Sequence, residues 1–361
     1  MFDFKKTYQL PFKIYIPNYI QAHIEEVSQL KRFFKFFRRC LYVILMRQKN
    51  LEVFTILPQN RKILWINISA PSLGDSLMDL SSRAMLKGRR VDLFTDVKNY
   101  QLYLNDEYFT NVYTKIKEVK KIKYDLVIID SYSSRSINIK SKIAPKTLFA
   151  GIFGYFNGPE VNRILFSFHK MNLLLGSLKN ENEINILAKN SISISTKDQN
   201  IVDDIVPKKY ITIVLGGEWN FKIYKNWDKV IDQLIVNDKE LRIIFIGSAN
   251  AKNISNELLK KYPRHNFLNF VERLSFNQSV EVARRSEVLL CCDGGLMHAA
   301  NAVSVNSVAL FARLTPEMLT TNYTNSFNLF DSDDVNNIPV DDILNKYYEA
   351  SSFVDNHPQS E

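Results

Sequence analysis

The sequence has few of the residues and runs that would identify a class of protein at once. Its three cysteines form no CxxC pair and no disulfide framework, and two of them lie in an apolar run typical of buried side chains: Cys40, Cys291 and Cys292. No Cys/His pattern has the spacing of a zinc site. No apolar run approaches the ~20 residues of a membrane-spanning helix, and residues 1–6 do not begin a secretory signal. We therefore expect a cytoplasmic chain that is soluble or peripheral to a membrane.

The charge balance is basic, with a formal net charge of +9 and a pI near 9.2. A basic surface attracts phosphates, nucleic acid or an anionic membrane, although a generally basic proteome would look the same. No RRM, KH or helix-turn-helix signature is present, so nucleic-acid binding is the weaker interpretation. Hydrophobic residues at 46% and charged residues at 24% indicate a globular chain, and 361 residues predict two domains.

The first 60 residues differ from the rest. Between Ser28 and Asn50, apolar residues recur at helical spacing and predict a helix with one apolar stripe: Leu30, Phe33, Phe34, Phe37, Leu41, Ile44 and Leu45. The neighbouring basic residues fall away from this stripe, namely Lys31, Lys35, Arg38 and Arg39. Such a helix can lie in a membrane interface, or it can pack on its own domain with a solvated basic face.

From Arg61 onward, strands and helices alternate. The first half predicts strands at 63–68, 91–95, 125–130 and 147–152, and helices at 75–87 and 163–178. After a polar connection at 180–199, the second half predicts strands at 210–215, 241–246, 267–270, 287–292 and 308–311, with helices at 227–236, 251–262, 277–285, 295–303 and 340–351. The alternation indicates parallel α/β sheets, divided as an extension (1–60), two domains (61–195 and 196–340) and a C-terminal helix and tail (341–361).

A first motif, residues 69–75, follows the first strand directly. Gly74 allows the loop to approach a ligand closely, and Asp75 stands at the expected start of a helix. Asp is a preferred N-cap residue, so Asp75 is either a helix cap or a general base aimed at a ligand beyond the strand.

A second motif follows the first strand of the second half. Gly216 and Gly217 can turn backbone N–H groups toward an anion, and Lys222 and Lys225 add positive charge before the next helix. The order of a Walker loop is absent. The motif predicts a phosphate-binding loop, with a simple strand-to-helix turn as the alternative.

A third motif, Asp293-Gly-Gly-Leu-Met-His298, follows the strand at 287–292. The N–H groups at the start of the next helix have no partners within that helix, so a diphosphate could bind there. His298, on the first turn, is either a ligand-binding side chain or a structural one.

Together these motifs resemble glycosyltransferase family 9, the bacterial lipopolysaccharide heptosyltransferases. Residues 293–298 are similar to the family's Asp-Thr-Gly-x-x-His, and Lys225-Asn-Trp227 is similar to its Lys-x-Trp, whose Lys contacts the donor phosphates. Gly74-Asp75 matches the loop whose Asp is the family's catalytic base. The resemblance covers residues 61–320. It implies the GT-B fold, with two Rossmann-like domains facing each other across a cleft, here preceded by a helical extension.

The resemblance implies an inverting glycosyltransferase that moves heptose from ADP-heptose onto a lipopolysaccharide or lipooligosaccharide core, an anionic lipid-linked acceptor. Asp75 would be the catalytic base. Donor binding would fall to Gly216, Gly217, Lys225, Asn250, Leu274, Asp293, Gly294, Gly295 and His298, with Lys222 and Arg313 as further phosphate contacts. We expect no metal and no cofactor, because the DxD spelling at 331–334 lies in a polar stretch. Contact with the cytoplasmic face of the inner membrane through residues 28–50 would suit such an acceptor.

Three departures from the family pattern leave the donor open. Gly294 replaces the usual Thr, the turn at 312–316 lacks the frequent Gly-Pro-Thr-x-Pro order, and no acid follows Gly247 to hold a ribose. Asn250 stands near that position instead. A GT-B enzyme that uses a hexose nucleotide is therefore the first alternative. A non-catalytic nucleotide-sugar-binding partner protein is the second, although the presence of Asp75 and Lys225 argues against it.

Overall fold

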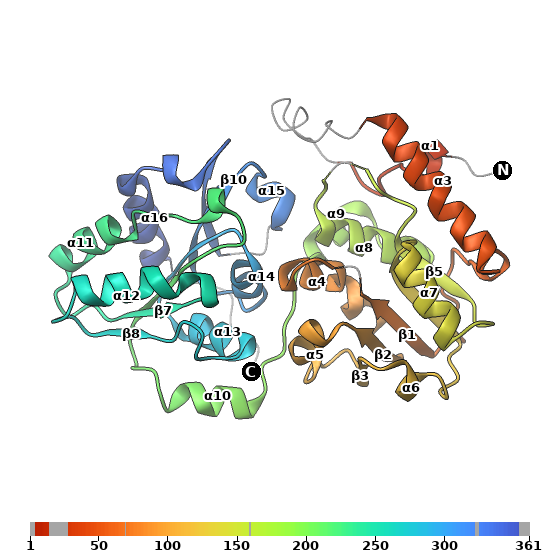
Figure 1. The fold of residues 1–361 in the computed structure, drawn as a ribbon, viewed down its shortest axis with the longest axis horizontal. Coiled ribbons are helices and arrows are strands. Elements are labelled where there is room, and N and C mark those ends of the chain that lie inside the picture. Colours follow the sequence, from red (N-terminus) through yellow and green to blue (C-terminus); the bar gives the residue numbers. More distant parts are fainter. Residues whose placement is uncertain (1–3, 14–27, 69, 159, 322–324, 354–361) are drawn as a thin grey trace. The chain divides into compact units, whose positions relative to one another are not determined.

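The computed structural model describes residues 4–13, 28–68, 70–158, 160–321 and 325–353 (Figure 1). The chain divides into two compact units, one formed by residues 1–193 with 317–322 and the other by residues 194–316 with 323–361. Each unit contains its own parallel sheet and its own hydrophobic core. The expected fold class, α/β with two parallel-strand sheets and an N-terminal helix, is confirmed.

The sheet of the first unit has five parallel strands in the order β3-β2-β1-β4-β5. The strands are β1 (Lys62–Asn67), β2 (Arg90–Thr95), β3 (Asn111–Tyr113), β4 (Leu126–Ser131) and β5 (Phe149–Gly154). β1 lies at the centre, and every residue after Lys62 is buried because both faces of the sheet are covered.

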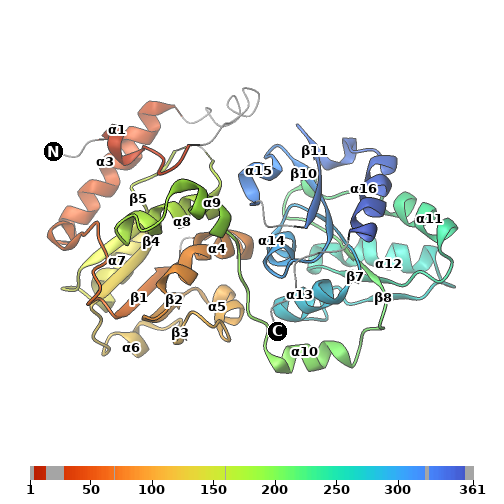
Figure 2. The same cartoon turned by 180° about the vertical axis from the view of Figure 1, so that it is seen from behind.

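The helices of the first unit cover both faces of this sheet (Figures 1 and 2). They are α1 (Phe4–Thr7), α3 (Gln29–Leu45), α4 (Leu73–Asp79), α5 (Val97–Tyr103), α6 (Ile116–Val119), α7 (Ser134–Ile143), α8 (Arg163–Leu174) and α9 (Glu181–Leu187), with 3-10 turns at Lys49–Leu51 and Ser81–Leu86. α3 packs beside α7, and α8 packs against α4 and α9. The first turn of α8 is thereby held next to α4.

The second unit has six parallel strands in the order β11-β10-β9-β6-β7-β8. The strands are β6 (Ile211–Val214), β7 (Ile243–Ile246), β8 (Phe267–Asn269), β9 (Leu289–Cys292), β10 (Ser307–Ala312) and β11 (Ser326–Asp331). The helices are α10 (Thr196–Asp203), α11 (Trp227–Asn237), α12 (Lys252–Lys261), α13 (Phe276–Arg285), α14 (Gly295–Ala302) and α16 (Val340–Ser352). The short helix α15 (Pro316–Leu319) begins at the last residue of the 194–316 segment, and its other residues belong to the first unit. Short 3-10 turns occur at Asn220–Lys222, Ala249–Ala251 and Val335–Asn337.

Several expected boundaries were wrong. The helix expected at 75–87 is instead α4, which begins at Leu73, followed by a 3-10 turn, and the helix expected at 163–178 ends at Leu174. The polar stretch 180–199 contains α9 and the start of α10. The Asn180–Glu183 capping box at the start of α9 is a sequence signal that could have revealed this helix.

The N-terminal helix packs on its domain through a different face from the one its apolar stripe suggested. The residues of α3 that are buried are Phe36, Cys40 and Val43, which join the core under α7. The predicted stripe, from Leu30 to Leu45, remains exposed to solvent. α3 therefore has two apolar rows, and only the smaller one, Phe36, Cys40 and Val43, faces the protein.

Candidate functional site

Asp75, the proposed base of the first unit, is held by a capping box at the start of α4. The N-cap is Ser72, whose hydroxyl accepts from the Asp75 N–H at 3.1 Å and donates to Asp75 Oδ2 at 2.6 Å. The Ser72 N–H also donates to Asp75 Oδ2, at 3.1 Å. Asp75 is thus the third residue of the helix rather than its cap. Its side chain keeps 22% of its surface exposed, so a ligand can still reach it.

Arg163 joins Asp75 to a second carboxylate, although the sequence did not mark it as a candidate. Its Nη1 donates to Asp75 Oδ1 at 3.2 Å, and its Nε and Nη2 donate to the two oxygens of Asp79 at 2.7 and 2.6 Å. Burial raises the pKa of Asp79 to about 7, although the Arg163 charge opposes this rise. Arg163 is the first residue of α8, and no local motif could link it to Asp75, because only the packing of α8 on α4 brings the two together.

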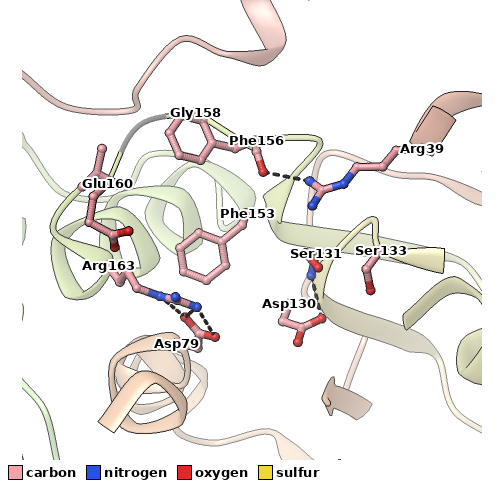
Figure 3. Close-up of a pocket in the computed structure, with 11 residues that line it drawn as sticks. Arg39, Asp79, Asp130, Ser131, Ser133, Phe153, Phe156, Gly158, Glu160 and Arg163 are labelled. Atoms are coloured by element: carbon pink, nitrogen blue, oxygen red, sulfur yellow. Dashed lines mark hydrogen bonds and ion pairs between the residues drawn. The ribbon is translucent and has the colours of Figure 1, made fainter. Parts of the chain in front are cut away.

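A cavity of about 270 Å³ opens beside this cluster, at the carboxyl ends of β4 and β5 (Figure 3). Figure 3 shows Asp79 and Arg163 on one side of the Phe153 ring, and Arg39 and Ser131 on the other. Arg39 comes from α3 and donates to the carbonyl of Phe156 at 2.8 Å. Paired acids, arginines and a hydroxyl around one aromatic ring are groups that can hydrogen-bond a polyhydroxylated ligand.

In the second unit, the loops that follow β6 and β7 pack directly on each other. Gly216 has a φ of +84°, and a Cβ there would lie 2.5 Å from Asn250 Oδ1, so only glycine fits. The Asn250 amide donates to the carbonyl of Gly217 at 2.5 Å. Three of the predicted donor-binding residues therefore meet at the carboxyl edge of this sheet.

The loop after β9 gathers a further set of charged groups. Lys222 Nζ forms an ion pair with Asp293 Oδ2, and His298 Nε2 lies 3.7 Å from Asp293 Oδ1. The side chains of Asp293 and His298 are both only 4% exposed. Gly294 is the N-cap of α14 and has no side chain with which to accept from the first N–H groups. These N–H groups, which begin with that of Gly295, are donors available to an anion.

The two lysines of the preceding loop differ in their surroundings. Lys222 reaches Asp293, whereas Lys225 is exposed and its backbone N–H donates to Asn336 Oδ1 at 2.8 Å. Arg313 approaches the same loop, because its Cζ lies 3.9 Å from the centre of the Phe221 ring. The Arg313 Nε donates to the carbonyl of Asp333 at 3.2 Å. Leu274 is half-buried in the turn before α13.

The aspartates at 331–334 serve a local turn at the end of β11. Asp331 Oδ1 accepts from the N–H groups of Asp333 and Asp334 at 2.8 and 3.0 Å, and these bonds lower the pKa of Asp331. Within the residues that the structure describes, no group of three or more His, Cys, Asp or Glu side chains could hold a metal ion. None of the helices described there is long and apolar enough to cross a membrane.

The two parallel-sheet units give this chain the GT-B fold, which it shares with solved family 9 structures. The chain belongs to glycosyltransferase family 9 (heptosyltransferase), whose family model matches residues 160–347, more than half of the sequence. No curated protein matches the sequence. Membership of the family, which the motifs led us to expect, is thus confirmed, and the chain is a glycosyltransferase.

Several solved structures share this fold. A family 9 glycosyltransferase from Veillonella parvula has a TM-score of 0.67 and 11% identity, over 82% of this chain and 99% of its own. ADP-heptose lps heptosyltransferase II from E. coli has a TM-score of 0.64 and 16% identity, over 80% of this chain and 98% of its own. The E. coli heptosyltransferase WaaC with ADP has a TM-score of 0.62 and 12% identity, over 80% of this chain and 99% of its own.

Proposed function

We propose that the protein transfers a sugar, with inversion, from a nucleotide-sugar to a lipopolysaccharide or lipooligosaccharide core, and that the donor is ADP-heptose. The observation that carries the proposal is the cluster of Lys222, Asp293 and His298 at the glycine-capped start of α14. The donor finds support in WaaC, which shares the fold and whose solved structures hold ADP and ADP-2-deoxy-2-fluoro heptose.

The donor diphosphate would bind at the start of α14. The N–H groups that follow Gly294 point along the helix axis, and the helix dipole favours negative charge there. Lys222 is held at the same place by Asp293, and it would stabilise the charge that grows on the diphosphate as the sugar leaves. Arg313 lies against the loop that carries Lys222 and Lys225, and Asn250 is hydrogen-bonded to Gly217 at the start of that loop.

Asp75 would act as the base. It takes the proton of the acceptor hydroxyl while that oxygen attacks the anomeric carbon and the bond to the nucleotide diphosphate breaks. A positioned base of this kind contributes roughly 10²–10⁴-fold to the rate. Arg163 and Ser72 hold the carboxylate in one orientation, which supports this assignment. We assign no metal to the reaction, because Lys222 and the α14 N–H groups supply positive charge to the diphosphate.

A donor panel tests the proposal. The full chain is incubated with ADP-heptose and with ADP-, UDP- and GDP-hexoses, with a lipid-linked core acceptor present, and products are identified by mass spectrometry. Heptosylated acceptor made only from ADP-heptose, at the same rate with a chelator, is the expected result. Transfer of a hexose would favour the alternative donor. Binding of a nucleotide-sugar without any transfer would favour the non-catalytic partner protein.

A further inference from the structure

The exposed row of α3 is the most concentrated apolar surface of the described residues. Seven of the 22 large hydrophobic side chains that are exposed lie within this 17-residue helix, so they form a patch rather than scattered contacts. Leu45, Leu30 and Phe34 are 67%, 64% and 60% exposed. An exposed apolar patch of this kind typically marks a surface that contacts a membrane or another protein.

The helix is fixed to its unit by the other row. Phe36, Cys40 and Val43 are at most 4% exposed and pack in the core with α7. At about 100° per residue, the exposed row lies about a third of a turn from this buried row. The exposed row is therefore not needed to hold α3 in place. Its side chains can contact another surface while the helix stays packed on the first unit.

Positive charge borders the exposed row on the side away from the core. Lys31, Lys35 and Arg38 are exposed there, and no acidic residue occurs between Ser28 and Asn50. Long basic side chains beside an apolar row can reach headgroups while their methylene groups lie along the lipid. Because the two basic rims of a pair of α3 helices would repel each other, charge complementarity favours an anionic bilayer over a second copy of the chain.

We propose that α3 docks the protein on an anionic lipid bilayer, with the row from Leu30 to Leu45 in the interface and Lys31, Lys35 and Arg38 at the headgroups. The opposite side of the same helix carries Arg39, which lines the cavity beside Asp79 and Arg163. Docking through the exposed row would therefore place α3 between the bilayer and this cavity. Membrane docking by α3 is argued independently of sugar transfer. Only its biological purpose, access to a lipid-linked acceptor, rests on the proposed function.

Vesicle sedimentation tests the docking. The full chain is mixed with phosphatidylcholine vesicles that either contain or lack phosphatidylglycerol, and is expected to bind the anionic vesicles. The triple variant Phe34→Ser, Phe37→Ser, Leu41→Ser should bind about tenfold or more weakly, because it removes the centre of the row. The matched control replaces three exposed hydrophobic residues elsewhere, Leu178→Ser, Ile186→Ser and Val236→Ser, and should bind as the unmodified chain does.

A second pair of variants tests the charges. Lys31→Gln, Lys35→Gln and Arg38→Gln together should weaken binding to anionic vesicles about tenfold or more. The control removes the same charge from three exposed lysines of the first unit, Lys117, Lys120 and Lys121, and should have little effect. Equal vesicle binding by the row variant and its control would overturn the proposal. The proposal would also be overturned if the unmodified chain did not bind vesicles but formed a dimer, and if the row variant were a monomer. A second copy of the chain would then cover the row.

An activity assay separates this proposal from the proposed function. With a water-soluble, lipid-free acceptor fragment, the row variant should keep the transfer rate of the unmodified chain, and with vesicle-borne acceptor it should lose most of that rate. Normal vesicle binding by a chain that transfers no sugar in either assay would contradict the proposed function and leave the docking standing. The melting temperature of each variant is compared with that of the unmodified chain, to check that α3 still packs through Phe36, Cys40 and Val43.

Discussion

Arg163 holds Asp75 and Asp79 with one guanidinium group. Its Nη1 lies 3.2 Å from Asp75 Oδ1, while Asp79, which is buried, receives two shorter bonds of 2.7 and 2.6 Å. The bidentate pair fixes the plane of the guanidinium, so the third bond points in one direction. Asp75 is thus oriented from two sides, by Ser72 within its own helix and by Arg163 from α8.

This arrangement makes Arg163 a positioning residue whose effect should appear in turnover. Arg163→Met should lower kcat by about 100-fold, because a small displacement of a catalytic group has a cost of this order. Donor affinity should not change. Arg135→Met changes an exposed arginine of α7 and serves as the control. Unchanged kcat in Arg163→Met would make Arg163 purely structural.

The two lysines after Gly217 should differ in their contribution to donor binding. Lys222→Ala should weaken nucleotide-diphosphate binding about tenfold or more in calorimetry, because a charge-assisted contact is lost. Lys225→Ala should weaken it as well, as the family resemblance implies, but by less. Lys229→Ala, at an exposed position of α11, is the control. Unchanged affinity in Lys222→Ala would show that its pairing with Asp293 only stabilises the loop.

Lys140 should make stability depend on pH. Its side chain is fully buried and donates to Gln48 Oε1 at 2.5 Å and to the Thr147 carbonyl at 2.6 Å, and burial lowers its pKa to about 7. Because an unfolded lysine keeps its proton to about pH 10, the folded state binds fewer protons between these values. The free energy of unfolding should therefore rise with pH there, by up to about 1.4 kcal/mol per pH unit from this group.

Denaturant unfolding of the native chain and of Lys140→Met, at pH 7, 8 and 9, measures this contribution. The native chain should gain stability relative to the variant at each step upward in pH. A difference between the two that stays constant over this range would contradict the lowered pKa. Below pH 7 both states carry the proton, so the difference should level off.

The buried pair of Arg83 and Asp106 should be a point of fragility in the first unit. Both side chains are 1% exposed, and Arg83 Nη2 lies 2.6 Å from Asp106 Oδ2. Asp106→Ala should lower the free energy of unfolding by roughly 3–5 kcal/mol, because it leaves a buried guanidinium without its carboxylate. Glu349→Ala, which breaks an exposed pair with Lys346, should lower it by less than about 1 kcal/mol. Similar losses from both would contradict this difference.

Local patterns in the sequence predicted much of the fold but less of the site. Continuous apolar runs such as β1 predicted the parallel sheets, whereas β3 and β11 are half-exposed edge strands without such runs and were missed. Asp293 and His298 follow a strand as predicted, since a βα loop is a local feature. The pairing of Arg163 with Asp75 depends on helix packing between distant segments, which no spacing reveals.

The orientation of α3 shows the same limit. Periodicity identified the helix and its larger apolar row, but which row faces the core depends on the shape of the surface beneath it. Phe36, Cys40 and Val43 fit beside α7, so the larger row remained outside. The strongest amphipathic signal therefore marked the exposed face of the helix rather than its contact with the core.

Sugar transfer by Asp75→Asn, measured together with its donor affinity, tests the central claim most directly. Asparagine keeps one oxygen, which can accept from Arg163 or from Ser72, and it cannot take a proton from the acceptor. The account predicts that transfer falls by roughly 10²–10⁴-fold while donor affinity stays within about twofold. Near-normal transfer by this variant would contradict the assignment of Asp75 as the catalytic base.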